Sequence, residues 1–166
     1  MKTKVAVLIV AVLAIWGMKR LYSDARADDL WWMLRPTARL VGITTGSAFA
    51  MEPGQGYLSR ERLFLIEKSC AGINFMIAAF GMLAFMLSRR AASAVSGAAV
   101  LGVSLAASYA AAVLVNTARI AAAMWLGGSA QVHRLEGIAV YFGGLLLLYE
   151  LAQRLDRRPM LLTSES

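Results

Sequence analysis

The fold is decided by residues 71–126, AGINFMIAAFGMLAFMLSRRAASAVSGAAVLGVSLAASYAAAVLVNTARIAAAMWL. Two apolar runs, 71–87 and 91–126, are separated by little more than the pair Arg89 and Arg90. About 20 apolar residues let a helix cross the hydrocarbon core of a bilayer, and arginines between two such runs stay with the headgroups. The stretch therefore predicts a helical hairpin that crosses a membrane twice. Small residues in the second run favour close packing of its helix: Gly97, Gly102, Ala106 and Ala110.

The composition of the whole chain agrees with a membrane protein. Of its 166 residues, 59% are hydrophobic and only 16% are charged, and the mean hydropathy is +0.62. A soluble domain usually carries about 25% charged residues. The net charge of +7 is therefore interpreted as charge flanking membrane helices, with no nucleic-acid partner expected. One cysteine and one histidine are too few ligands for a zinc or iron–sulfur site, so no metal or cofactor is expected.

Two further apolar runs complete the predicted membrane region, VAVLIVAVLAIWGM at 5–18 and GIAVYFGGLLLLYEL at 137–151. We expect an all-α integral membrane protein of one domain, 1–166. Its membrane helices are predicted at about 5–20, 71–88, 95–118 and 137–152, with an outer segment at 21–69 and a cytoplasmic tail at 153–166. The flanking lysines and arginines then share one side, which favours the cytoplasm, and we expect a bacterial inner membrane. A cleaved signal peptide ending at residues 25–27, ARA, is the alternative for the first run.

The outer segment contains its own structural signals. Residues 28–46, DDLWWMLRPTARLVGITTG, combine acidic residues, Trp31 and Trp32 with apolar residues at helical spacing, which predicts an interfacial or re-entrant helix interrupted at Pro36. Turn-forming residues at 53–56 and a short extended stretch at 63–66 predict a small β-hairpin after it.

Three polar residues are brought together by this topology. Cys70 begins the second membrane helix, Arg119 lies in the last turns of the third, and His133 lies in the connection that follows. Because successive membrane helices are antiparallel, all three residues fall on the same membrane face. The prediction holds for either orientation of the protein in the bilayer.

Cysteine, histidine and arginine together suggest acyl transfer. A thiol needs a base such as His133 to become the nucleophilic thiolate, whereas Arg119 is a poor base and a good stabiliser of an oxyanion. Asn116 lies three residues before Arg119 and is expected to orient it or to donate to the oxyanion. Glu136 lies three residues after His133 and is expected to hold the imidazole tautomer.

Each of these residues also has a plainer interpretation. Cys70 can be a small buried filler, His133 a polar side chain near the interface, and Arg119 a side chain that reaches lipid phosphates from a helix ending near Asn116. Under that interpretation the protein is a non-catalytic membrane scaffold, or an accessory subunit of a transporter or secretion system.

The segments KSCAGINF, NTARIA and HRLEGIAVYF resemble the exosortase/archaeosortase family, and in particular the short exosortases of class K. The matching positions are Cys70 with Gly72, Asn116 with Arg119, and His133. The resemblance implies a membrane cysteine peptidase or transpeptidase without a cofactor. Its substrate would be an exported protein that ends in a short motif, a membrane helix and a basic tail. It also implies Cys70 as nucleophile, His133 as general base and then acid, and Arg119 as stabiliser. Typical members have more membrane helices, so this chain would be a minimal core.

Overall fold

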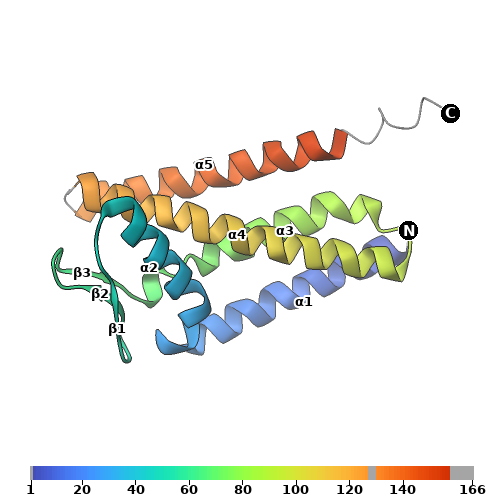
Figure 1. Ribbon diagram of the computed structural model, residues 1–166. Coiled ribbons are helices and arrows are strands. Elements are labelled where there is room, and N and C mark those ends of the chain that lie inside the picture. The colour runs from blue at the N-terminus through green and yellow to red at the C-terminus, as the bar shows by residue number, and fades with distance from the viewer. Residues whose placement is uncertain (1, 127–129, 158–166) are drawn as a thin grey trace.

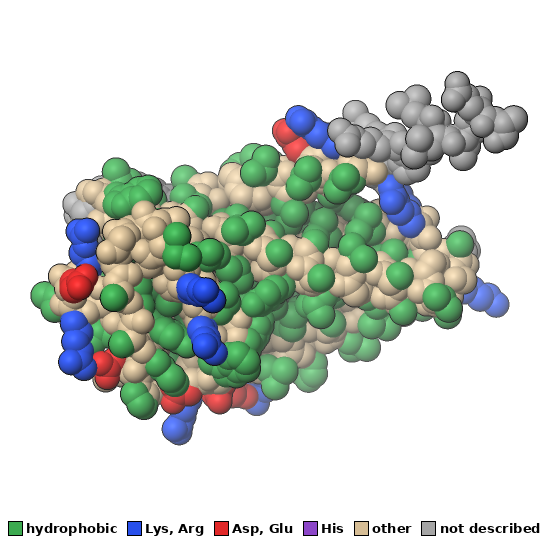
Figure 2. Space-filling view, in the orientation of Figure 1, with side chains coloured by type: hydrophobic (Ala, Val, Ile, Leu, Met, Phe, Trp, Pro, Cys, Tyr) green, Lys and Arg blue, Asp and Glu red, His purple; other side chains and the backbone are tan. Residues whose placement is uncertain are grey.

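In the computed structural model, four long helices lie side by side, and a short helix and a small sheet cover one end of the bundle (Figure 1). The structure describes residues 2–126 and 130–157, without the side chains of 130–136, 156 and 157. The long helices are α1 (Lys2–Asp24), α3 (Ile73–Leu87), α4 (Ala94–Leu126) and α5 (Ala130–Arg157). This part of the chain holds four helices long and apolar enough to cross a membrane, as predicted. Hydrophobic side chains line the bundle along its length, and charged ones concentrate towards its ends (Figure 2).

The predicted helical hairpin is formed by α3 and α4, which are joined by the 3-10 turn η3 (Ser88–Arg90). Ser88 ends α3 by donating its hydroxyl to the Phe85 carbonyl over 2.7 Å. Ser93 and Ser96 then start α4, because each backbone N–H is bound by the other's hydroxyl, at 2.8 and 3.2 Å. The polar turn therefore supplies partners for helix ends that lack them.

Two helices extend further than predicted. α4 continues to Leu126 instead of ending near residue 118, and α5 begins at Ala130 instead of 137. Neither glycine nor proline occurs between residues 103 and 126, so nothing in the backbone ends α4 earlier. The segment that contains His133 therefore belongs to the backbone of α5, although a connection was predicted there.

The prediction that small residues of α4 allow close helix packing holds for only part of the helix. A Cβ at Gly97 would lie 2.9 Å from Val7 Cγ2, so α1 and α4 do pack closely there. Gly102, by contrast, has no neighbour within 4 Å of an added Cβ, and Ala106 and Ala110 are exposed. The buried face of α4 instead repeats every four residues at Val100, Ser104, Ser108 and Ala112.

The predicted interfacial helix is α2 (Trp31–Thr45), preceded by the 3-10 turn η1 (Asp28–Leu30). Its buried side, which includes Met33, Leu34 and Val41, joins the main core together with α3 and α4. Pro36 does not interrupt the helix. A proline lacks the N–H that would bind the carbonyl four residues earlier, that of Trp32. The Tyr109 hydroxyl donates to this carbonyl instead, over 2.9 Å, and its ring stacks on Trp32.

In place of the predicted β-hairpin, the structure has a three-stranded antiparallel sheet. Its strands lie in the order β1 (Ala50–Glu52), β2 (Gly56–Ser59) and β3 (Phe64–Ile66). Leu58 pairs with Ala50 on one side and with Leu65 on the other. The Asp28 carboxylate accepts a hydrogen bond from the Gly54 N–H at 3.0 Å, which ties the first turn of the sheet to the start of α2. The sheet leads directly into Cys70.

Candidate active site

Cys70 ends the 3-10 turn η2 (Lys68–Cys70) and is partly exposed. Gly72 follows it with φ +70°, a left-handed conformation that glycine adopts without strain. An added Cβ at Gly72 would also lie 3.1 Å from both Cβ and Cγ of Asn116, closer than side chains normally approach. The glycine two residues after the cysteine is therefore required both by the turn and by the approach of α4.

Asn116 connects the elements of the site. Its Nδ2 donates to the Cys70 carbonyl, and its Oδ1 accepts from Arg119 Nε at 3.2 Å and from the Tyr141 hydroxyl at 2.9 Å. Asn116 is fully buried, so these bonds replace the water that a carboxamide otherwise binds. Of the two roles predicted for Asn116, orienting Arg119 is the one for which the structure shows a hydrogen bond.

Arg119 is held in place but has spare hydrogen-bonding capacity. Its guanidinium carbon lies 5.3 Å from the centre of the Tyr141 ring, in cation–π geometry. Its Nη2 is buried and has no hydrogen-bond partner among the described residues. α4 continues to Leu126, so it does not end near Asn116 as the alternative role of Arg119 had assumed. A partly buried guanidinium with an unused donor is suited to bind an oxygen atom of a ligand or of a reacting group.

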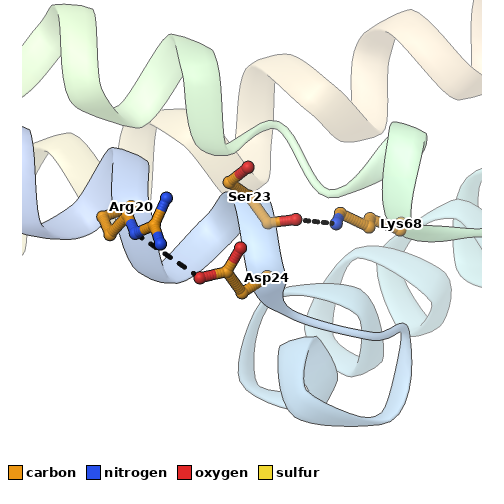
Figure 3. A network of polar contacts seen from close by, with 4 residues as sticks. All are labelled: Arg20, Ser23, Asp24 and Lys68. Carbon is orange, nitrogen blue, oxygen red and sulfur yellow. Dashed lines mark hydrogen bonds and ion pairs between the residues drawn. The ribbon is translucent and has the colours of Figure 1, made fainter.

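The segment before Cys70 is fastened to the end of α1. The Lys68 ammonium donates to the Ser23 carbonyl over 2.9 Å, and the Tyr22 hydroxyl donates to the Lys68 carbonyl over 3.2 Å. Figure 3 shows Lys68 reaching the last turn of α1, where Arg20 and Asp24 form an ion pair at 3.6 Å. The first helix therefore contributes directly to the position of the cysteine.

The surroundings of the thiol are polar on one side. The Ser69 hydroxyl lies 3.8 Å from the Cys70 sulfur and donates to the Glu67 carboxylate over 2.8 Å. Tyr22 of α1 and Tyr141 of α5 pack against the same core cluster as Cys70. The sulfur thus lies where α1, η2 and α5 meet.

An apolar cleft of about 870 Å³ opens next to this site between α1, α2, α3 and α4. Two residues near Cys70 belong to the wall of this cleft. Tyr22 contacts the segment before Cys70 in space, and Ile73 follows Cys70 in the sequence. Gly102 and Ala106 line it on α4, which is where the predicted close helix packing is absent. The small residues keep this part of the bundle open instead of closing it.

The structure brings together Cys70, Gly72, Asn116 and Arg119, four of the residues singled out in the sequence. The side chains of the other two, His133 and Glu136, lie outside the described residues. Tyr141 was not among the predicted site residues, but it contacts both Asn116 and Arg119. A tyrosine in an apolar helix usually finds a partner for its hydroxyl, and this was the available signal. No group of three metal-binding side chains occurs in the described part of the chain.

Comparison of the chain with protein-family models, curated proteins and solved structures gives no match. The class that the fold and the site define is a small helical protein with four potential membrane spans and one cysteine–asparagine–arginine–tyrosine cluster.

Proposed function

We propose that this chain is a membrane-embedded cysteine protease or transpeptidase of the exosortase type. It acts on exported proteins that end in a short sorting motif, a membrane helix and a basic tail, and it cleaves them through a thioester intermediate. The enzyme lies in the bacterial inner membrane, and its active site faces the outer, periplasmic side.

The observation that carries this proposal is the connection made by Asn116. One buried carboxamide binds the backbone of the only cysteine and also the intramembrane arginine. A scaffold in which Arg119 only meets lipid phosphate gives no reason for this connection. An enzyme needs it, because a nucleophile and an oxyanion-binding group must be held in fixed relative positions.

The reaction follows from the chemistry of these groups. In the proposal, His133 takes the proton of Cys70, and the thiolate sulfur attacks the carbonyl carbon of the scissile peptide bond. In the proposal, the Nη2 of Arg119, which has no partner among the described residues, stabilises the negative oxygen that develops. When the C–N bond breaks, the histidine returns its proton to the leaving amine, and a thioester remains on Cys70. Water or a cell-surface amine then attacks the thioester, which yields an acid or a new amide and regenerates the thiol.

The apolar cleft supports a substrate that arrives within the membrane. Three of the helices around it can span a bilayer, and its lining is mostly apolar, with Asp24 and Asp29 as its charged residues. An apolar helix of the substrate that docks in it, displacing membrane lipids, would hold the adjoining sorting motif near Tyr22 and Cys70.

The test replaces the nucleophile. The full chain is co-expressed with an exported protein of the same cell that has the expected C-terminal motif, helix and basic residues. We expect Cys70→Ala and Cys70→Ser to accumulate normally in the membrane and to lose processing completely, and wild type to give a hydroxylamine-sensitive adduct. Gly143→Ala is the control, because an added Cβ at this helical position meets nothing within 4 Å. Processing by purified Cys70→Ala would exclude the nucleophile role and favour the scaffold.

A further inference from the structure

We propose that the hollow between α2 and the sheet is a binding site for a phosphate group, supplied by an anionic membrane phospholipid. The hollow has a volume of about 530 Å³, and its polar lining consists of Arg35, Arg39, Ser47 and Tyr57. Among the described residues, no hydrogen bond links these side chains to Cys70, Asn116 or Arg119, and the proposal does not depend on the peptidase activity.

The two arginines supply the charge. Arg35 and Arg39 lie four residues apart on α2, so they share one face of the helix, and both are exposed. No ion pair or hydrogen bond of either guanidinium is found among the described residues. Some other surface arginines do have acidic partners: Arg60 lies 2.9 Å from Glu52, and Arg154 lies 3.5 Å from Glu150. Two uncompensated guanidinium groups that line one hollow favour an anion with several acceptor oxygens.

Ser47 shows that the hollow is a built site. The residue is only 6% exposed, and its Oγ is buried without a hydrogen-bond partner among the described residues. α2 ends at Gly46 in the left-handed conformation, and the Ser47 N–H returns to the Gly42 carbonyl at 3.1 Å. A Cβ at Gly42 would lie 2.7 Å from the Ser47 carbonyl oxygen, so only glycine lets the serine fold back this closely. A buried hydroxyl without a partner is costly unless a ligand accepts its hydrogen bond.

The position of the hollow favours a lipid as the source of the phosphate. Trp31 and Ile43, at the two ends of α2, are 57% and 71% exposed. Such residues are stable where the helix lies among lipid headgroups and upper acyl chains. Figure 2 shows basic side chains within a largely hydrophobic surface over α2. At this depth the phosphate of a phospholipid can meet the arginines while its chains cover the exposed apolar residues.

The experiment measures binding to the purified full chain in a neutral detergent. The two probes are short-chain phosphatidylglycerol and glycerol 3-phosphate at equal concentrations, and the readouts are tryptophan fluorescence and the thermal midpoint. We expect phosphatidylglycerol to change the fluorescence saturably and to raise the midpoint by several degrees. The double variant Arg35→Gln/Arg39→Gln should bind at least ten-fold more weakly. The control Arg60→Gln/Arg62→Gln removes the same charge from the turn between β2 and β3 and should bind like wild type.

Ser47→Ala changes no charge and should weaken binding about five-fold. Equal binding by wild type and both double variants would overturn the site. If glycerol 3-phosphate binds as tightly as the lipid, the phosphate site stands but its ligand is a soluble phosphate, and the assignment to a phospholipid is overturned. If neither probe binds wild type, the proposal fails. A folded double variant is recognised by a thermal transition that remains cooperative without ligand.

Discussion

At the scale of single residues, Arg119 differs from an arginine that merely reaches the membrane surface. One of its nitrogens is fixed by Asn116, its guanidinium faces the Tyr141 ring, and a further nitrogen is buried without a partner among the described residues. A charged side chain inside a membrane segment is costly. A guanidinium that is held by several contacts at such a position therefore favours a functional role for Arg119. What distinguishes a fixed guanidinium from an ammonium is its planar set of donors, which a substitution can test.

Arg119→Lys should therefore be severe although it conserves charge. A lysine ammonium cannot bind Asn116 and an oxyanion at the same time in the geometry of the guanidinium fork. We expect turnover of a cognate substrate to fall by about 100-fold, as for loss of an oxyanion donor, with little change in membrane accumulation. Arg154→Lys is the matched control, because Arg154 is exposed on α5. Near-normal turnover of Arg119→Lys would count against oxyanion binding.

Tyr141→Phe tests the hydroxyl separately from the ring. The change removes the 2.9 Å bond to Asn116 Oδ1 but keeps the aromatic face next to Arg119. A net hydrogen bond contributes about 1 kcal/mol, so we expect turnover to fall by about five-fold, mainly in kcat. Tyr141→Leu, which also removes the cation–π contact, should cost more. Tyr149→Phe, on the same helix, is the control, and an unchanged kcat in Tyr141→Phe would contradict the positioning role.

At the scale of elements, α2 illustrates how tertiary structure repairs a local defect. Pro36 leaves the Trp32 carbonyl without its helical partner, and the Tyr109 hydroxyl from α4 supplies another. The local sequence predicts an interruption at Pro36. The residue that compensates for it, Tyr109, lies 77 positions after Trp32, so the local pattern does not reveal it. The helix persists because the lost bond is replaced from a neighbouring element.

A double-mutant cycle measures this replacement. Tyr109→Phe alone leaves a partly buried carbonyl unsatisfied and should lower the thermal midpoint of the detergent-purified protein. In a Pro36→Ala background the new N–H can bind the same carbonyl. Tyr109→Phe should therefore lower the thermal midpoint less in that background. We expect a coupling of about 1 kcal/mol between the two positions. Strictly additive effects would show that the Tyr109 bond does not compensate for the proline.

How much of these elements the sequence predicts depends on how local their signals are. The long helices follow from apolar runs, and the buried side of α2 follows from residues such as Leu34 and Val41 at helical spacing. The bounds of β1 were not predicted, because its three residues are stabilised by pairing rather than by a pattern of their own. Likewise, Asn116 and Arg119 are visible in the sequence, whereas the part played by Tyr141 depends on the packing of α5 against α4.

At the scale of the whole molecule, the site depends on the antiparallel arrangement of α3 and α4. Cys70 precedes α3, and Arg119 lies near the end of α4, so both meet at the end of the bundle that carries α2 and the sheet (Figure 1). The turn with Arg89 and Arg90 lies at the opposite end. If basic residues mark the cytoplasmic side, the thiol and the sheet must face outwards.

Cysteine accessibility tests this orientation. In a Cys70→Ser background, Gln55→Cys places a thiol on the exposed turn of the sheet, and Ala92→Cys places one in the exposed turn before α4. A membrane-impermeant maleimide should label residue 55 in intact cells and residue 92 only after the inner membrane is opened. The inverse pattern would keep the hairpin but reverse its orientation. Labelling of both residues from the same side would show that α3 does not cross the membrane, and the cluster around Asn116 could not then form at one membrane face.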